Sequence, residues 1–322
     1  MIRAGRLAAV VAATLTLAAC GTSFQFGGGV VATGIYVANR DAASLTVYSL
    51  SASGNAAPLR TIAGGATGIT SPTGVAVTGT GVTYIASQTL SNVIVHAGGA
   101  NGNVAPTRTI AGGSTGLNEP WYIALDLTGN IYVANESGNS VTVYSAGANG
   151  NAAPLRTISG SSTGLATPTG LALDASGNIY VANSGAPTVV VFAAGANGNA
   201  APIRTISGPL TQMTACLGDV IVDGSGVLYV GGACQDAIFI FGALANGNVA
   251  PIRVISGAST GITEVTGLGL DGSGNLYAGD FAVSGGKINV YAAGANGDAA
   301  PIRTISGAAT GLSGPRGVVV VP

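Results

Sequence analysis

The stretch Pro168–Gly208 reads PTGLALDASGNIYVANSGAPTVVVFAAGANGNAAPIRTISG, and it decides the fold. It contains four short runs rich in apolar or β-branched residues, at 171–174, 179–182, 189–192 and 203–206. Small and turn-forming residues separate them, such as the segment 175–178, Ala-Ser-Gly-Asn. Apolar runs of this length, rich in β-branched residues and bounded by Gly, Asn and Asp, are typical of strands joined by tight turns. We therefore expect four antiparallel strands, called a to d here in chain order.

This unit recurs along most of the chain. The pattern A-P-x-R-[TV]-I places an arginine at Arg60, Arg108, Arg156, Arg204, Arg253 and Arg303. Successive arginines are 48, 48, 48, 49 and 50 residues apart. Four short strands in each of several such units are the signature of β-propeller blades. A right-handed β-solenoid is the competing repeat fold, but its coils are shorter.

The two ends of the repeat region complement each other. The chain enters at a strand b, Ile35–Ala38, and it finishes with a strand a, Pro315–Val321, that has no strand b after it. Together the two orphans complete a sixth blade, which would remove an open sheet edge. We predict an all-β protein with a single six-bladed β-propeller over residues 30–322, closed by its C-terminal strand.

Two recurring segments resemble a known family. The strand b segment S-G-N-[IL]-Y-[VA]-A-N, preceded by P-x-G-[LV]-A-[LV]-D, is similar to the NHL-type repeat of six-bladed propellers of the TolB-like group. The resemblance covers nearly the whole repeat region and implies the propeller fold. It leaves the function open, because this scaffold carries binders, lactone hydrolases and lyases alike.

The first residues are typical of an export signal. Arg3 and Arg6 precede an uncharged apolar run, Leu7–Ala19, which is too short to span a bilayer. The following Leu-Ala-Ala-Cys, ending at Cys20, resembles the lipobox of bacterial lipoproteins, in which the cysteine is acylated. We expect a signal peptide over residues 1–19, and a lipidated Cys20 with a flexible tether over 20–29. The alternative is an ordinary signal peptide with an incidental cysteine.

Composition excludes several classes of protein. Charged residues make up only 7% of the chain and apolar types 47%, the reverse of a disordered protein. With 11 basic against 12 acidic residues, there is no basic footprint for nucleic acid. We expect a monomeric exported protein without a cofactor, anchored by lipid to the cell envelope at the outer membrane or cell surface.

Residues repeated in every blade are expected to serve the fold. One slot of strand b holds Tyr36, Tyr84, Tyr132, Tyr180, Tyr229 and Tyr277, and a slot of strand c holds Tyr48, Tyr144, Phe192, Phe241 and Tyr291. These rings could form a ligand platform, but packing between blades is the better interpretation. His96, the single histidine, falls in the strand c slot and is expected to pack there. The a–b turns begin with the aspartates Asp126, Asp174, Asp223 and Asp271. Turn formation accounts for these residues, so no calcium site is needed to explain them.

Departures from the repeat fall mainly on one face of the propeller, the face formed by the d–a and b–c connections. The predicted binding set is Arg40, Asp41, Glu119, Trp121, Tyr122, Glu136, Asp236, Glu264 and Arg316. Gln88, Gln235, Asp280 and Phe281 also vary in the b–c loops. Because strand a lines the axis, we expect Glu119, Trp121, Tyr122, Glu264 and Arg316 at the mouth of the central channel. The set suits a small-molecule or peptide site, and the alternative is a solvated rim with incidental substitutions.

Cys216 and Cys234 are placed symmetrically about the a–b turn near residue 225. Opposed positions of an antiparallel hairpin are close enough for a disulfide. Since the protein is expected to be exported, we predict that the two are bonded, with two buried thiols as the alternative.

These observations favour a non-enzymatic binding scaffold whose partner is an envelope protein, a peptide or a glycan. The alternative is a metal-dependent hydrolase, similar to lactonases, or a lyase. That alternative has only Glu119, Glu264 and either Asp219 or Asp280 as ligands at the channel mouth, and no central histidine. A carbohydrate-binding lectin would need an exposed aromatic residue in each blade, and only Trp121 and Tyr122 qualify.

Overall fold

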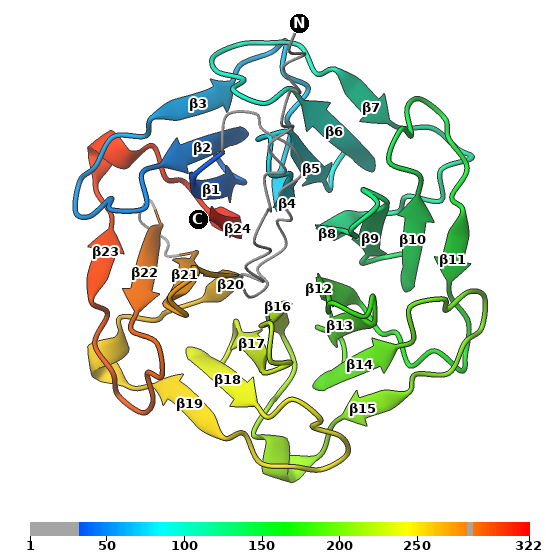
Figure 1. The fold of residues 1–322 in the computed structure, drawn as a ribbon, viewed down its shortest axis with the longest axis vertical. Coiled ribbons are helices and arrows are strands. Elements are labelled where there is room, and N and C mark those ends of the chain that lie inside the picture. Colours follow the sequence, from blue (N-terminus) through cyan, green and yellow to red (C-terminus); the bar gives the residue numbers. More distant parts are fainter. Residues whose placement is uncertain (1–31, 282–285) are drawn as a thin grey trace, which may run out of the picture.

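Six four-stranded antiparallel sheets stand around a central axis (Figure 1). The structure, a computed structural model, describes residues 32–281 and 286–322. The protein is a six-bladed β-propeller, which confirms the predicted fold. Cys20 and the proposed signal peptide lie outside the described residues. No helix in the described ranges is long and apolar enough to cross a membrane.

Each blade runs from an inner strand a to an outer strand d. Blade 1 is β24 (Pro315–Val321), β1 (Gly34–Asn39), β2 (Ser44–Tyr48) and β3 (Arg60–Ala63). Blade 2 is β4 (Pro72–Val77), β5 (Thr83–Ser87), β6 (Asn92–His96) and β7 (Arg108–Ile110). Blade 3 is β8 (Pro120–Leu125), β9 (Ile131–Asn135), β10 (Ser140–Tyr144) and β11 (Arg156–Ile158). Blade 4 is β12 (Pro168–Leu173), β13 (Ile179–Asn183), β14 (Thr188–Phe192) and β15 (Arg204–Ile206).

The last two blades carry the same order of strands. Blade 5 is β16 (Leu217–Val222), β17 (Leu228–Gly232), β18 (Ala237–Phe241) and β19 (Arg253–Ser256). Blade 6 is β20 (Val265–Leu270), β21 (Leu276–Asp280), β22 (Lys287–Tyr291) and β23 (Arg303–Ile305). Short 3-10 helices occur in three d–a connections, η1 (Pro209–Thr211), η2 (Ala258–Thr260) and η3 (Ala308–Thr310).

The C-terminal strand closes the ring as predicted. β24 pairs antiparallel with β1, from Gly34 opposite Val321 to Asn39 opposite Pro315. The two ends of the described chain therefore share one sheet, and no inner strand is left without a partner.

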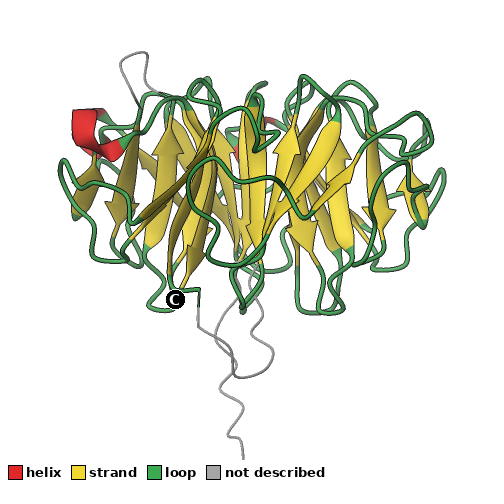
Figure 2. Ribbon diagram, turned by 90° about the horizontal axis from the view of Figure 1, so that it is seen from above, coloured by secondary structure: helices red, strands yellow, loops and turns green. Residues whose placement is uncertain are grey.

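The ring has two distinct faces (Figure 2). The upper face carries the d–a and b–c connections, and the lower face carries the a–b turns and the ends of the c–d loops. Strand a runs downward, so its first residues lie beside the axis at the upper face. β12 begins at Pro168, three residues before the predicted start, because the strand continues through a bulge between Pro168 and Gly170.

The hydrophobic core lies between adjacent blades. Tyr180 of blade 4 packs in one cluster with Phe239 and Phe241 of blade 5, and the other clusters likewise join neighbouring blades. Burying each large apolar side chain contributes about 1.5–3 kcal/mol to the free energy of unfolding. The repeated aromatic residues are thus core residues, as predicted. His96 is buried among them in the strand c slot, also as predicted.

The c–d loops protect the outer edges of the sheets. Gly102 of blade 2 lies beside strand β3 of blade 1, where its N–H donates to the Thr61 carbonyl at 2.6 Å and its carbonyl accepts from Ala63 N–H at 3.2 Å. The side chain of Asn101 accepts a further bond from Thr61 N–H at 2.9 Å. Gly102 has a φ of 75°, a conformation that glycine adopts without strain. Equivalent bridges occur at all six blade junctions, so the recurring A-N-G-N segment is a latch between blades.

The recurring arginines reinforce the same junctions. Arg156 donates to the carbonyls of Ala194 and Ala196 in the next blade, at 2.9 and 3.0 Å, and to the Tyr132 hydroxyl at 2.9 Å. Each of the six guanidinium groups also lies against the strand b tyrosine of its own blade. The structural role predicted for these arginines is confirmed.

The aspartates of the a–b turns also act within the fold. Oδ1 of Asp126 accepts the backbone N–H groups of Thr128 and Asn130, both at 2.9 Å. Hydrogen bonds to the ionised form lower the pKa of Asp126 against the opposing effect of burial. The other three turns repeat the backbone bonds, which explains the recurring aspartate as a turn former.

Candidate functional site

The inner strands approach each other closely around the axis. In most of them the residue at the closest approach is glycine, because a side chain there would clash with the neighbouring backbone. A Cβ on Gly74 would lie 2.7 Å from the Trp121 carbonyl oxygen, and one on Gly267 would lie 2.4 Å from that of Arg316. Gly170 and Gly317 occupy the same place in their blades. Side chains occur at this position in only two inner strands of the described ring, and these are Tyr122 and Asp219.

Tyr122 crosses the axis from blade 3. Its hydroxyl lies 3.0 Å from the carbonyl oxygen of Thr266 in blade 6 and 2.8 Å from that of Arg316 in blade 1. Its side chain is 5% exposed. Sequence analysis expected Tyr122 to be an exposed aromatic at the channel mouth. The structure corrects this: Tyr122 is a buried bridge across the axis, because glycine backbones around it leave just enough room for the ring.

Asp219 lies against the same hydroxyl from blade 5. Its carboxyl oxygens accept the backbone N–H groups of Val220 at 2.7 Å and Leu268 at 3.0 Å. Burial raises the pKa of Asp219 well above its usual range, although these hydrogen bonds act against it.

Trp121, the residue before Tyr122, is half-buried at the upper mouth and packs against the core of blades 3 and 4. Two guanidinium groups lie over its ring, that of Arg40 at 5.8 Å and that of Arg316 at 5.6 Å from the centroid. Arg316 also lies 3.9 Å from the ring centroid of Phe281. Trp121 is therefore the centre of a cation–π cluster that joins blades 1, 3 and 6.

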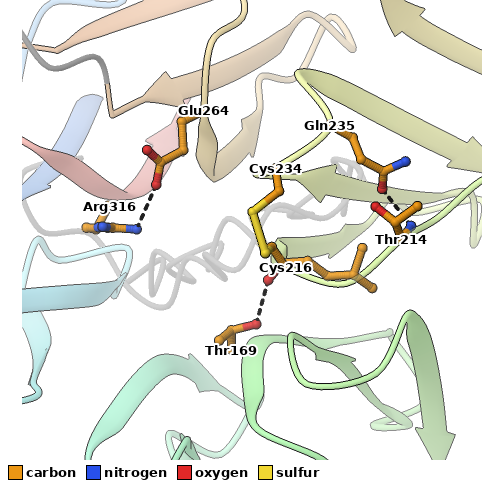
Figure 3. Close-up of a disulfide and its surroundings, with 8 residues drawn as sticks. Thr169, Thr214, Cys216, Cys234, Gln235, Glu264 and Arg316 are labelled. Carbon is orange, nitrogen blue, oxygen red and sulfur yellow. Dashed lines mark hydrogen bonds and ion pairs between the residues drawn. A yellow bond between two sulfur atoms is a disulfide. The ribbon is translucent and has the colours of Figure 1, made fainter.

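Arg316 is the most enclosed member of this cluster. Its guanidinium lies 3.5 Å from Oε1 of Glu264, with 12% of the arginine side chain exposed (Figure 3). Its Nε is buried and has no hydrogen-bond partner among the described residues. Burial lowers the pKa of Arg316, and the Glu264 carboxylate opposes that shift.

A second chain of contacts links three b–c turns. Arg40 donates to Oε1 of Gln88 at 3.0 Å, and Gln88 donates to Oε2 of Glu136 at 3.0 Å. Burial and then the nearby Glu119 raise the pKa of Glu136. Glu119 itself accepts a hydrogen bond from Ser137 at 2.5 Å. Asp41 lies beside Gly314 at the start of β24, where its backbone N–H donates to the Ser313 carbonyl at 3.2 Å.

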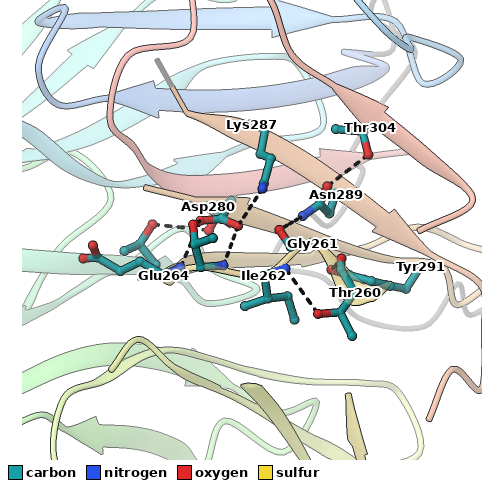
Figure 4. Close-up of polar contacts among 12 residues, drawn as sticks. Thr260, Gly261, Ile262, Glu264, Asp280, Lys287, Asn289, Tyr291 and Thr304 are labelled. Atoms are coloured by element: carbon teal, nitrogen blue, oxygen red, sulfur yellow. Dashed lines mark hydrogen bonds and ion pairs between the residues drawn. The ribbon is translucent and has the colours of Figure 1, made fainter. Parts of the chain in front are cut away.

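Glu264 is held in place by a buried carboxylate beside it, that of Asp280 (Figure 4). Asp280 is fully buried and accepts the Glu264 N–H at 2.9 Å and the Thr263 hydroxyl at 2.6 Å. The Lys287 ammonium lies 3.5 Å from the same carboxylate. The loop before β20 therefore owes its shape to Asp280, which stands where blades 1, 3 and 4 have a buried asparagine.

Most of the predicted binding set meets at this mouth, in a group that we call the rim cluster: Arg40, Asp41, Gln88, Glu119, Trp121, Glu136, Glu264, Phe281 and Arg316. Gln88 and Phe281 were not in the predicted set, although both vary in the b–c loops. Each is a link between two predicted residues, and no sequence pattern marks that role. Asp236 lies apart, exposed on the turn between β17 and β18, and no contact with the rim cluster is seen among the described residues.

The disulfide between Cys216 and Cys234 is present, which confirms the predicted pairing. Their Cα atoms are 5.6 Å apart, just beyond the paired ends of β16 and β17 (Figure 3). Both residues reach the upper surface in part, so the alternative of two buried thiols is wrong. The bond ties the d–a loop of blade 5 to its b–c turn.

The carboxylates proposed for a metal-dependent enzyme are already engaged. Glu119 accepts a hydrogen bond from Ser137, and Glu264 pairs with Arg316. Asp280 pairs with Lys287 and a loop backbone, and Asp219 accepts two backbone N–H groups beside the axis. In the ranges 32–281 and 286–322, no three His, Cys, Asp or Glu side chains form a group that could hold a metal ion. The donors present thus do not fit a metal centre at this mouth.

Comparison with known proteins supports the fold alone. No family model matches the chain, and no curated protein matches it in sequence. The chain is similar in structure to a protein of unknown function from Bacteroides caccae, with a TM-score of 0.66 and 10% identity over 90% of this chain and 98% of that one. A functionally unknown protein from Desulfotomaculum acetoxidans matches with a TM-score of 0.58 and 12% identity, over 89% and 98% of the two chains. The WD40 propeller domain of Doa1 matches with a TM-score of 0.54 and 12% identity, over 75% and 70%.

Proposed function

We propose that this protein is an exported, lipid-anchored β-propeller that binds a partner in the cell envelope through the rim cluster. The proposal rests on one observation: residues repeated in the blades and residues that depart from the repeat have different roles. Repeated residues serve the core, the latches and the turns. Residues that depart from the repeat gather in one connected cluster on the upper face, where binding residues of a rigid scaffold are placed.

The chemistry of the rim cluster suits a polar partner with at least one apolar group. Aromatic and arginine side chains are enriched among residues that dominate binding energy, and here Trp121, Arg40 and Arg316 lie together. Carboxylates of Glu119, Glu136 and Glu264 surround them. Such a surface fits a peptide, a protein loop or a glycan of the envelope, and the NHL-type resemblance is compatible with a binder.

Binding can be tested with charge-neutral variants of the rim cluster. Arg40→Gln and Glu136→Gln each remove the charge at one end of the chain of contacts through Gln88 and leave the core intact. Envelope fractions would be passed over the immobilised protein, and retained components identified and titrated. We expect both variants to lose the retained component by about tenfold in affinity, as for loss of a charged hydrogen bond.

The matched control is Val104→Ser, an exposed position on the outer wall. It should retain the same component with unchanged affinity. Equal retention by all four proteins would contradict binding at the rim cluster, and retention of nothing by the parent would contradict the binding function itself.

The anchor has its own test. Cys20→Ser removes the acylation site, and the protein should move from the membrane fraction to the soluble exported fraction. Persistent membrane association of this variant through washing at high salt would remove lipidation at Cys20 from the proposal.

A further inference from the structure

Exposed large apolar side chains are concentrated on the lower side of the ring. Ten such side chains are at least one-third exposed among the described residues. Seven of them lie at the lower face: Leu59, Leu127, Leu155, Ile203, Leu244, Ile252 and Ile302. Leu90 and Leu210 lie in upper connections, and Val104 lies on a latch at the outer wall.

Five of the seven share one position of the repeat, the residue between proline and arginine in A-P-x-R. Leu59, Leu155, Ile203, Ile252 and Ile302 stand directly before an outer strand and are 53–64% exposed. They form a ring at the lower circumference, interrupted in blade 2 by Thr107. These side chains lie outside the core. The neighbouring arginine, and not the apolar residue, makes the contact with the next blade.

The two faces also differ in net charge: the lower side is positive and the upper face is negative. The lower side carries the six repeat arginines against the four turn aspartates, an excess of positive charge. Two further carboxylates belong to neither face, those of Asp219 at the axis and Asp298 on an outer latch beside Ser259. The upper face carries Arg40, Lys287 and Arg316 against six carboxylates, those of Asp41, Glu119, Glu136, Asp236, Glu264 and Asp280. The net negative charge of the propeller therefore lies on the side away from the apolar ring.

The described chain also begins at the lower face. Ala32, its first residue, lies next to the lower end of β1, where its carbonyl accepts from the Tyr36 hydroxyl at 3.0 Å. Cys20 is twelve residues before Ala32. A fully extended chain of that length spans at most about 43 Å. An anchor at Cys20 would thus be tethered to the propeller at its lower face.

We propose that the lower face of the propeller docks on the headgroup region of an anionic lipid bilayer, with the apolar ring inserted at the edge of the acyl chains. This inference rests on the proposed lipid anchor for its orientation. Single apolar side chains recur around the ring, where leucine and isoleucine can reach acyl chains at the bilayer interface. The half-buried arginines beside them add positive charge near the lipid phosphates. A second copy of the chain would need a contiguous apolar patch instead. Docking leaves the rim cluster facing away from the membrane.

The test places a reporter at single positions of the full chain. Leu155→Cys, Ile203→Cys and Leu244→Cys would be labelled on the lower face, and Leu90→Cys and Leu210→Cys on the upper face as matched controls. The label is a fluorophore whose emission shifts to shorter wavelength in lipid. The parent protein, with Cys216 and Cys234 bonded, controls for labelling elsewhere. The probe is a vesicle of phosphatidylethanolamine and phosphatidylglycerol.

We expect the lower labels to shift and to be quenched by a quencher attached to the acyl chains, whereas the upper labels remain in water. The triple variant Leu155→Ser, Ile203→Ser, Ile252→Ser should weaken this insertion by about tenfold. Lower labels that stay in water would overturn the proposal, and so would lower labels that shift without lipid at high protein concentration, since that result indicates a dimer. If the anchor fails, the parent's Cys20 takes up label, and titrating the same labelled variants with vesicles still tests the face.

Discussion

His96 shows how one side chain can depart from the repeat within the core. In the same slot, Tyr48, Tyr144 and Tyr291 each donate a hydrogen bond to a threonine carbonyl in the preceding loop, at 2.6–2.7 Å. The threonine of blade 2 is Thr67. Neither ring nitrogen of His96 makes a hydrogen bond of good geometry. Burial lowers the pKa of His96, and the nearby Thr67 backbone offsets only part of that shift.

Restoring tyrosine should therefore stabilise the protein. His96→Tyr is expected to raise the free energy of unfolding by about 1–3 kcal/mol, through a new bond to Thr67 and loss of an unsatisfied buried ring. His96→Phe, the control, gains only the second part. Because the folded state disfavours the protonated histidine, wild type loses stability as pH falls below about 6.5. The advantage of His96→Tyr in chemical denaturation should grow from pH 7 to pH 5, and a constant difference would contradict this account.

Asp219 predicts a pH dependence of opposite direction. Its raised pKa means that the folded state holds a proton that the unfolded state releases. Stability should therefore fall as pH rises from the unfolded pKa, near 4, towards the folded pKa, by up to about 1.4 kcal/mol for each pH unit. Asp219→Asn removes this titration, so its unfolding free energy should fall less over the same range. Asp236→Asn, at an exposed turn, serves as the control at the surface. Parallel pH profiles for wild type and Asp219→Asn would show that Asp219 is ionised in the fold.

At the scale of elements, the blades are joined by contacts that the sequence repeats but does not explain by itself. Outer strands of three or four residues would be weak edges alone. The latch from the next blade and the adjacent arginine complete their hydrogen bonding. Those contacts run between units 40 residues apart, so they appear only when the blades are placed side by side.

The arginines offer a graded test of this account. Arg156 makes three hydrogen bonds, two across its junction and one to Tyr132 of its own blade. Among the described residues Arg253 keeps one bond across its junction, to the Ala295 carbonyl at 3.1 Å. Arg156→Ala should lower the free energy of unfolding by about 2–3 kcal/mol, and Arg253→Ala by about half as much. Thermal unfolding of both variants measures this. Equal losses would indicate that stacking on tyrosine, common to both, carries the effect.

At the scale of the whole molecule, stability depends on closure of the ring. Each blade buries its faces against two neighbours, and blade 1 obtains its inner strand only from β24. Val318 and Val320 of that strand pack with blade 6, while Val319 and Val321 pack with blade 2. Removing the strand would expose both junctions and leave β1 as an open edge.

A chain truncated after Gly314 should consequently lose cooperative unfolding. The expected result is a broad, low-temperature transition by calorimetry, with binding of a hydrophobic dye at neutral pH. Deletion of Pro322 alone is the control, since it follows the last paired residue. A sharp melting transition in the truncated chain, near that of the control, would show that five complete blades suffice.

The sequence by itself determined the architecture, because the strands and turns of each blade are encoded by residues within a single repeat. Period, strand number, closure and the Cys216–Cys234 pairing all depend on spacing along the chain or on positions across one hairpin. The tertiary structure alone decided what lies at the axis and the rim. Tyr122 is buried because glycines from other blades leave a narrow space around it, and Asp219 meets it from two blades away. Gln88 and Phe281 become links in the rim cluster for the same reason: their partners come from different blades, and the distance between blades is set by packing, which no single repeat encodes.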